Sequence, residues 1–297
     1  MNAASCPLTP ALSPDAVGGE GEGVLRRARP GLGTLVEIRM EGLSEAQALA
    51  AIDAAFAQVA DVHRLMSFHE PDSDLSRVHR ARVGVDVEID IRTAEVLRCA
   101  QQIAERSNGA FDPTMAARAV AQGGLPWPDS PFVPDAQANW QDIEWLDARC
   151  IRLRRPLWLD LGGIAKGYAV DRAIEVLVQG GAAQACVNAG GDLRIVGPRA
   201  ETVILRVAHC DASHTIELRD GAVASSAAMS LVAHADSGDM LDCFGVSVAA
   251  PSCMLADALT KVAALADVDM AAATLKHFGA QALVHARDGW HELAHAA

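Results

Sequence analysis

The sequence predicts an α+β fold in which antiparallel-rich sheets pack against helices. Apolar residues recur at helical spacing in some segments and alternate with polar residues, as in strands, in others. In the C-terminal half, the strand-like segments mostly follow one another through short turns, which favours hairpins over repeated βαβ units. Because 51% of the residues are hydrophobic and only 4% are aromatic, we expect an aliphatic core of closely packed small side chains.

The N-terminal part predicts a tail, a strand and a long helix. Residues 1–23 are rich in Pro, Gly and Ala, so we expect a disordered tail there and the folded domain over residues 24–297. Residues 33–40 alternate between apolar and polar side chains and predict a strand. A capping-box pattern begins at Ser44, and the apolar spacing after it predicts a helix over residues 45–66.

The middle of the chain predicts a surface loop, a helix and an irregular connection. Residues 67–79 are polar and rich in turn-forming residues, so they predict a surface loop whose histidines are solvated. A helix is expected from about residue 93 to 106, ending where Gly109 can adopt the left-handed conformation. Four prolines exclude regular structure from much of residues 121–135.

The C-terminal half predicts strands, several of them in hairpins, together with three helices. The strands are expected at residues 156–163, 185–197 (with a glycine turn inside), 202–208, 214–219, 222–226 and 244–251, and a last hairpin turns near residues 288–289. The helices are expected at residues 168–178, 255–266 and about 269–278.

Charge and cysteine content exclude several classes of protein. The formal net charge of −13 argues against a nucleic-acid-binding protein, because phosphate affinity comes from clustered Lys and Arg. No apolar run is long enough for a transmembrane helix. Seven cysteines without a C-x-x-C pair predict reduced thiols. The N-terminus lacks the features of a secretory signal, and no apolar segment precedes Cys6 as a lipid anchor would require, so we expect a cytoplasmic location.

Three segments place glycine beside a charged residue, and we interpret each as following a strand. They are Asp160 to Gly167, Asn188 to Asp192 and Gly109 to Asp112. Glycine lets the backbone approach a ligand closely and point N–H groups at an anion, so these segments and Lys166 favour a site for a phosphate-bearing ligand. The spacing fits neither the P-loop nor the dinucleotide-binding glycine motif. Alternatively, the glycines merely turn the chain and Lys166 is solvated.

Asp257 and Thr260 form a candidate metal site near the start of a predicted helix. At positions i and i+3 they face the same way, and their oxygens suit Mg²⁺. The alternative is a helix-start charge beside an exposed hydroxyl. The ten histidines show no metal-ligand spacing, and the absence of G-x-S-x-G leaves a hydrolase triad without a nucleophile signal.

Seven sequence blocks, taken in order, resemble one enzyme family. The blocks are LGT (32–34), SFHEPDSDLSRVH (67–79), GAFDPT (109–114), DLGGIAKGYAVD (160–171), VNAGGDLR (187–194), VASSA (223–227) and LADALTK (255–261). Together they resemble the FAD:protein FMN transferases, the ApbE-type flavin transferases, over most of the chain. The resemblance implies an ApbE-like, T-fold-related architecture, either as one body or as two lobes with the FAD cleft between them.

The resemblance also implies an activity. A transferase of this family binds FAD, cleaves its pyrophosphate with Mg²⁺ and transfers FMN to a Thr or Ser hydroxyl of an acceptor protein, releasing AMP. Two alternatives remain open. One is an FAD-binding protein of the same fold that has lost the transfer reaction, and the other is an FAD pyrophosphatase that yields FMN and AMP.

By resemblance, the flavin nucleotide is bound by residues from five of these blocks. The set comprises Ala110, Phe111 and Asp112 for the adenine and ribose, Leu32 and His69 near the flavin, Asp160 and Lys166 as ligand contacts, and Asn188, Gly190, Gly191 and Asp192 along the same cleft. Asp160 and Lys166 are also expected to be catalytic.

The metal and the third catalytic position depart from the family pattern. The resemblance implies metal ligation by the Gly163 carbonyl and Asp257, but Lys261 stands where the family normally has a metal-binding Thr, with Thr260 one position earlier. Protonated lysine cannot ligate Mg²⁺, so either its ammonium stands where the metal charge would be or Thr260 takes over. The family's H-x-x-D-P-x-T-G stretch is absent, and His234 is the candidate to replace its histidine.

Overall fold

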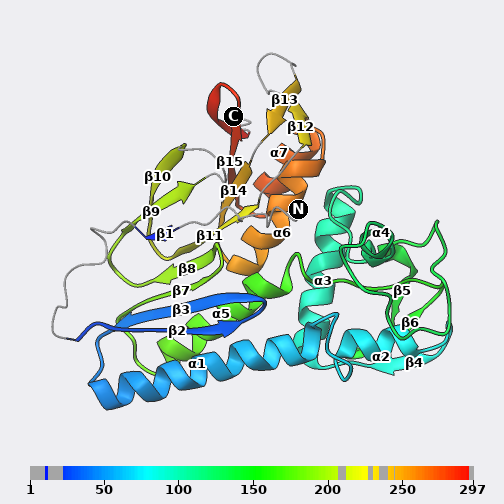
Figure 1. The fold of residues 1–297 in the computed structure, drawn as a ribbon, viewed down its shortest axis with the longest axis horizontal. Coiled ribbons are helices and arrows are strands. Elements are labelled where there is room, and N and C mark those ends of the chain that lie inside the picture. Colours follow the sequence, from blue (N-terminus) through cyan, green and yellow to red (C-terminus); the bar gives the residue numbers. More distant parts are fainter. Residues whose placement is uncertain are drawn as a thin grey trace. The chain divides into compact units, whose positions relative to one another are not determined.

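An eight-stranded antiparallel sheet is the centre of the first of two compact units (Figure 1). The computed structural model describes residues 11–12, 23–206, 212–226, 230–233, 240–243 and 245–293. The first unit comprises the described residues up to Ala60 and those from Lys166 onward, and the second comprises Asp61–Ala165. Most of the predicted tail therefore lies outside the described residues.

Strands of the large sheet come from both ends of the chain. Their order across the sheet is β16 (Gly289–Leu293), β15 (Gln281–Ala286), β14 (Gly245–Ala250), β11 (Gly221–Ser226), β8 (Asp192–Val196), β7 (Gln184–Ala189), β3 (Thr34–Glu41) and β2 (Leu25–Gly31). Every neighbouring pair is antiparallel. This arrangement confirms the α+β prediction and the preference for hairpins.

A smaller sheet covers one face of the large one. Its order is β1 (Ala11–Leu12), β9 (Glu201–Arg206) and β10 (Ser213–Leu218). The register pairs Cys186 with Ile195, so both side chains point to the same face, where they pack with Val203 and Leu205 of β9. A further hairpin is formed by β12 (Ser230–Ala233) and β13 (Met240–Cys243).

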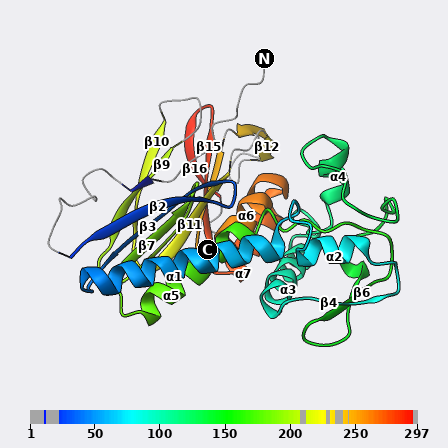
Figure 2. The same cartoon turned by 60° about the horizontal axis from the view of Figure 1, so that its bottom comes forward.

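Four helices belong wholly or partly to the first unit. They are α1 (Glu45–Met66), α5 (Ala165–Gln179), α6 (Cys253–Leu265) and α7 (Val268–His277). Both views show α1 and α5 running alongside β3 and β7 (Figures 1 and 2), and α6 packs against β11 and β14. The bounds of α1 match the prediction because the 3.6-residue apolar spacing is regular and the Gln47 side chain accepts hydrogen bonds from the Ser44 N–H at 3.3 Å and from the Ser44 hydroxyl at 2.7 Å.

The second unit contains short elements around its own core. They are α2 (Asp74–Arg80), α3 (Ile91–Arg106), α4 (Ala116–Ala121), a 3₁₀ turn at Trp140–Asp142, and a three-stranded sheet in the order β4 (Asp86–Glu88), β6 (Cys150–Leu153), β5 (Ile143–Trp145). Leu97 and Ile103 of α3 and Ile151 of β6 are fully buried in this unit. Residues 122–135 form no helix or strand, as the prolines predicted.

Two predictions about secondary structure were wrong. Residues 156–163 form no strand, although Leu157, Trp158 and Leu159 are buried as an apolar strand would be. Residues 67–79 are not a loop throughout, because α2 occupies their second half. Among the described helices, none combines the length and apolar character needed to span a bilayer.

Candidate functional site

The β7–β8 turn carries four of the predicted binding residues. Gly190 and Gly191 both have positive φ, at 62° and 111°, which glycine adopts without strain. The turn is held by the Asn188 side chain, whose Oδ1 accepts a hydrogen bond from the Gly191 N–H at 3.0 Å. Asp192 follows as the first residue of β8. The turn thus presents bare backbone directly before a carboxylate.

The β2–β3 turn lies beside the β7–β8 turn. It consists of Leu32 and Gly33, both with positive φ, and a Cβ added at Gly190 would lie 2.4 Å from Oγ1 of Thr34. The structure therefore places the turn that contains Leu32 in the neighbourhood of Gly190, and its contact with the flavin stays a prediction.

The N-terminal ends of α5 and α6 are in direct backbone contact. A Cβ added at Gly167 would lie 2.2 Å from the carbonyl oxygen of Cys253, so only glycine allows this approach. The Asp171 carboxylate joins the same two helices by accepting hydrogen bonds from the backbone N–H groups of Cys253 and Met254, both at 2.8 Å. Asp171 also pairs with Arg194 of β8 at 2.6 Å.

Four charged side chains meet where these two helices begin, and we call them the lysine–carboxylate cluster: Lys166, Asp192, Asp257 and Lys261. Lys166, the second residue of α5, pairs with Asp192, and Lys261 pairs with Asp257 one turn earlier in α6. The Lys261 ammonium also donates to the main-chain carbonyl of Asp257 at 2.9 Å. The cluster therefore matches two carboxylates with two ammonium groups.

The two kinds of charge in the cluster differ in their access to solvent. The side chains of Asp192 and Asp257 are 2% and 1% exposed, whereas those of Lys166 and Lys261 are 29% and 30% exposed. The lysine side chains are therefore the part of the cluster that reaches solvent. Such a surface suits an anion, and the nearby glycine turn adds backbone N–H donors.

The pKa shifts within the cluster follow from burial and mutual charge. Burial raises the pKa of Asp192 to about 6, and the Asp257 carboxylate adds to the rise while Lys166 opposes it. Burial acts against the charged forms of Lys166 and Asp257, but attraction to the opposite charges outweighs it. The pKa of Lys166 is therefore raised by Asp257 and Asp192, and that of Asp257 is lowered by Lys261 and Lys166.

The residues expected to bind Mg²⁺ do not form a set of oxygen ligands. The Asp257 carboxylate is taken by the Lys261 ammonium, and the buried Thr260 hydroxyl donates to the Asp257 carbonyl at 2.7 Å. For the Gly163 carbonyl, metal ligation stays a prediction. The described residues include no group of three or more His, Cys, Asp or Glu side chains that could hold a metal ion. This donor set does not fit a divalent cation.

The second unit brings together another part of the prediction. Ala110, Phe111 and Asp112 follow α3, and the Asp160 N–H donates to the carbonyl of Pro113 at 2.8 Å, so Asp160 lies next to this segment. Asp112 accepts hydrogen bonds from the backbone and hydroxyl of Thr114, while burial raises its pKa. These residues stay predicted nucleotide contacts.

Of the two predicted histidines, the structure describes only His69. His69 is exposed on the loop before α2. His234 lies outside the described residues, so its role stays a prediction.

The sequence interpretation missed the role of His79, which is buried and not solvated. Its Nε2 lies 2.9 Å from the backbone nitrogen of Leu159 and 3.0 Å from its carbonyl oxygen. The imidazole thus lies against the backbone of Leu159, next to Trp158, which forms an isolated bridge with Met115. Burial also lowers the pKa of His79 to about 4.

The buried His79 predicts a loss of stability in mild acid. Its pKa lies below the unfolded value of about 6.5, so the neutral form stabilises the fold fully above that pH and this contribution is lost as the pH falls toward 4. We expect the free energy of unfolding to fall by about 2 kcal/mol between about pH 7 and pH 5 from this group alone. Urea unfolding of the wild type and of His79→Gln at both pH values measures the difference. His69→Gln, which changes an exposed histidine, should keep the wild-type pH dependence. If the free energy of unfolding changes equally with pH in the wild type and in His79→Gln, the role of His79 is contradicted.

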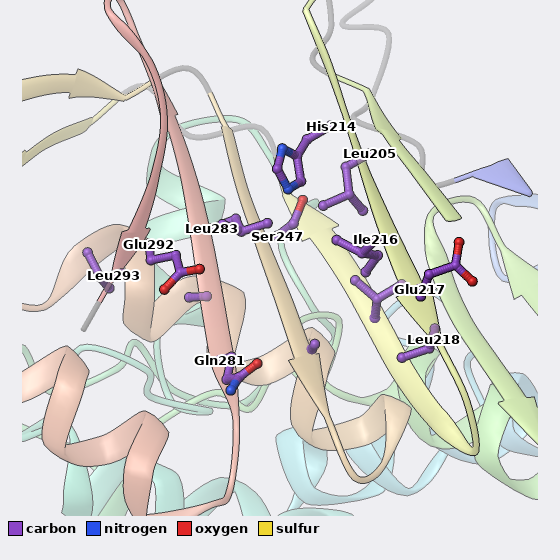
Figure 3. A pocket seen from close by; sticks show the side chains of 13 residues that line it. Leu205, His214, Ile216, Glu217, Leu218, Ser247, Gln281, Leu283, Glu292 and Leu293 are labelled. Carbon is purple, nitrogen blue, oxygen red and sulfur yellow. The ribbon is translucent and has the colours of Figure 1, made fainter. Parts of the chain in front are cut away.

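A cavity of about 280 Å³ lies apart from the lysine–carboxylate cluster (Figure 3). It opens between β10 and the strands β14 and β15, and its lining includes Leu205, His214, Ile216 and Leu283. None of the predicted site residues that the structure describes lines it. The cavity is therefore separate from the candidate site.

Comparisons with known proteins agree with the resemblance seen in the sequence. The sequence model of the ApbE family matches residues 32–284. The FAD:protein FMN transferase of Rhodobacter capsulatus is 30% identical over 175 residues, covering 56% of this chain and 33% of that protein. The one from Treponema pallidum is 27% identical over 187 residues, covering 58% and 51%. The matched regions thus span between a third and about half of the length of these relatives.

Solved structures show the same fold. The apo flavinyl transferase ApbE of Pseudomonas stutzeri superposes with a TM-score of 0.75 at 20% identity, over 91% of this chain and 94% of the other. The flavin transferase ApbE of Vibrio cholerae gives 0.74 at 21% identity, over 92% and 97%. These structures confirm the predicted architecture.

Proposed function

The chain belongs to the ApbE family, and from this membership we propose that it is an FAD:protein FMN transferase. In the proposed reaction, a Thr or Ser hydroxyl oxygen of an acceptor protein attacks the FMN phosphorus of FAD. The bond from that phosphorus to the bridging oxygen breaks, AMP leaves with this oxygen, and the hydroxyl proton is lost. The products are AMP and a protein with covalently attached FMN.

The lysine–carboxylate cluster is the observation that supports this proposal most directly. The FAD pyrophosphate is anionic, and charge on its oxygens must be stabilised as the phosphorus is transferred. Lys166 offers an ammonium on a partly exposed side chain, and Asp192 holds it in place next to the glycine turn at residues 190–191. Preorganised donors of this kind lower the barrier because they need no rearrangement during the reaction.

The finer parts of the proposal rest on family membership. The Thr or Ser acceptor and the release of AMP belong to this level, as do the catalytic roles of Asp160 and His234. The expected Mg²⁺ does not fit the side chains around Asp257, so no step is assigned to it. The cytoplasmic location likewise stays a prediction from the sequence.

The test is to identify the products formed from FAD. Purified protein is incubated with FAD and an acceptor protein of the family's substrate class, once with MgCl₂ and once with EDTA, and the mixture is analysed by chromatography and intact mass. AMP together with an FMN-sized mass gain on the acceptor supports the proposal. AMP with free FMN identifies a pyrophosphatase instead, and bound FAD without AMP identifies an FAD-binding protein.

A further inference from the structure

We propose that the ammonium of Lys261 occupies the cation position at Asp257, so that this chain handles FAD without a divalent metal ion. The part of this proposal that concerns FAD rests on the proposed function. The part that concerns cations rests on the lysine–carboxylate cluster alone.

Two oxygens of Asp257 surround the Lys261 ammonium. The ammonium contacts Oδ1 of Asp257 and also donates to the main-chain carbonyl oxygen of Asp257 at 2.9 Å. A side-chain carboxylate oxygen and a main-chain carbonyl oxygen are ligands that Mg²⁺ would use. The ammonium therefore takes two oxygens that a cation would need.

The charges of the lysine–carboxylate cluster are already balanced. A divalent ion at Asp257 would have to displace Lys261, and Lys166 would oppose it from the other side of the cluster. The two ion pairs already match each carboxylate with one ammonium. No carboxylate charge remains in the cluster to compensate an added divalent ion.

Lysine is rare in this chain, where most basic residues are arginine. Of 25 basic residues only three are lysines, and two of these, Lys166 and Lys261, belong to the cluster. An ammonium is a compact charge with three donors, whereas a guanidinium is broad and planar. Lysine is therefore the basic side chain that best substitutes for a small cation.

Manganese binding to the protein alone tests the cation part of the proposal. Mn²⁺ is titrated into metal-free wild type, Lys261→Thr and the double variant Lys261→Thr with Asp257→Asn, and free Mn²⁺ is followed by electron paramagnetic resonance. We expect no stoichiometric Mn²⁺ site in the wild type and a new site in Lys261→Thr. The variant should bind Mn²⁺ at least about 100-fold more tightly than the wild type does, which is beyond the range for indirect effects on a metal site. The double variant should lose that site.

Three results would overturn the cation assignment: a stoichiometric Mn²⁺ site in the wild type that Asp257→Asn removes, no gain of a site in folded Lys261→Thr, or a gained site that survives in the double variant. Lys276→Thr is the matched control, because Lys276 is exposed on α7, and it should behave as the wild type. If Lys261→Thr does not fold, Lys261→Met replaces it, because methionine keeps the apolar stem. The wild-type titration still shows whether the wild type has a Mn²⁺ site.

Calorimetric titration of FAD tests the second part. We expect the wild type to bind FAD with the same affinity in EDTA and in MgCl₂, and Lys261→Thr to bind about tenfold more weakly in EDTA and to recover with MgCl₂. Wild-type affinity that depends on MgCl₂ overturns this part. If FAD binds under neither condition, the proposed function fails, whereas the Mn²⁺ titration remains a valid test of Lys261.

Discussion

Gly167→Ala is expected to lower the free energy of unfolding by more than about 3 kcal/mol, above the usual cost of overpacking a core. The new Cβ would lie 2.2 Å from the carbonyl oxygen and 2.5 Å from the carbonyl carbon of Cys253. Because both are backbone atoms, no side-chain rotation relieves the clash, and α5 and α6 must move apart. Thermal and urea unfolding measure the loss.

The separation of the two helices should also disturb the candidate site. The Gly167 N–H donates to the Asp257 carboxylate at 3.3 Å, and Asp171 of α5 bonds to the first N–H groups of α6. Gly124→Ala is the matched control, because its Cβ would be 3.4 Å from the nearest atom, and its effect should stay within about 1 kcal/mol. Equal stability of the wild type and Gly167→Ala would contradict the close approach of the helices.

Lys166→Met is expected to reduce kcat/KM for AMP release from FAD by about 100- to 1,000-fold, as loss of one preorganised donor does in other active sites. Methionine keeps most of the apolar stem but removes the charge that would face the phosphates. It also leaves the buried Asp192 without its ammonium partner. Product chromatography under saturating and limiting FAD gives the two kinetic constants.

Two controls separate this catalytic effect from a folding defect. Lys276→Met removes the exposed lysine of α7 and should keep wild-type turnover. Unfolding of Lys166→Met by urea shows whether the variant is folded at the assay temperature. A folded Lys166→Met with wild-type turnover would remove Lys166 from the site.

Regular periodicity explains which parts of the fold could be predicted. The helices from residue 45 onward and most strands of the large sheet carry clear apolar spacing. The edge strand β2 could not be found this way, because its sequence LRRARPG is exposed along most of its length and contains three arginines. Such charges are typical of edge strands, which must avoid pairing with other chains.

The contacts of the candidate site depend on tertiary structure. Lys166 and Asp192 are 26 residues apart in the sequence, and Asp171 lies 82 residues from the Cys253 N–H that it caps. The sequence shows that Lys166, Asp192 and Asp171 are charged, but their partners follow only from the packing of α5 against α6 and β8. The same holds for His79 and Leu159, which are 80 residues apart.

The scarcity of lysine has a practical consequence for spectroscopy. Reductive methylation with ¹³C-formaldehyde labels primary amines, and in this chain only Lys166, Lys261 and Lys276 carry them on side chains. Each dimethylamino resonance can therefore be assigned with single variants. Two of the three lysine signals report directly on the neighbourhood of Asp192 and Asp257, so their chemical shifts test in solution whether added FAD reaches that place.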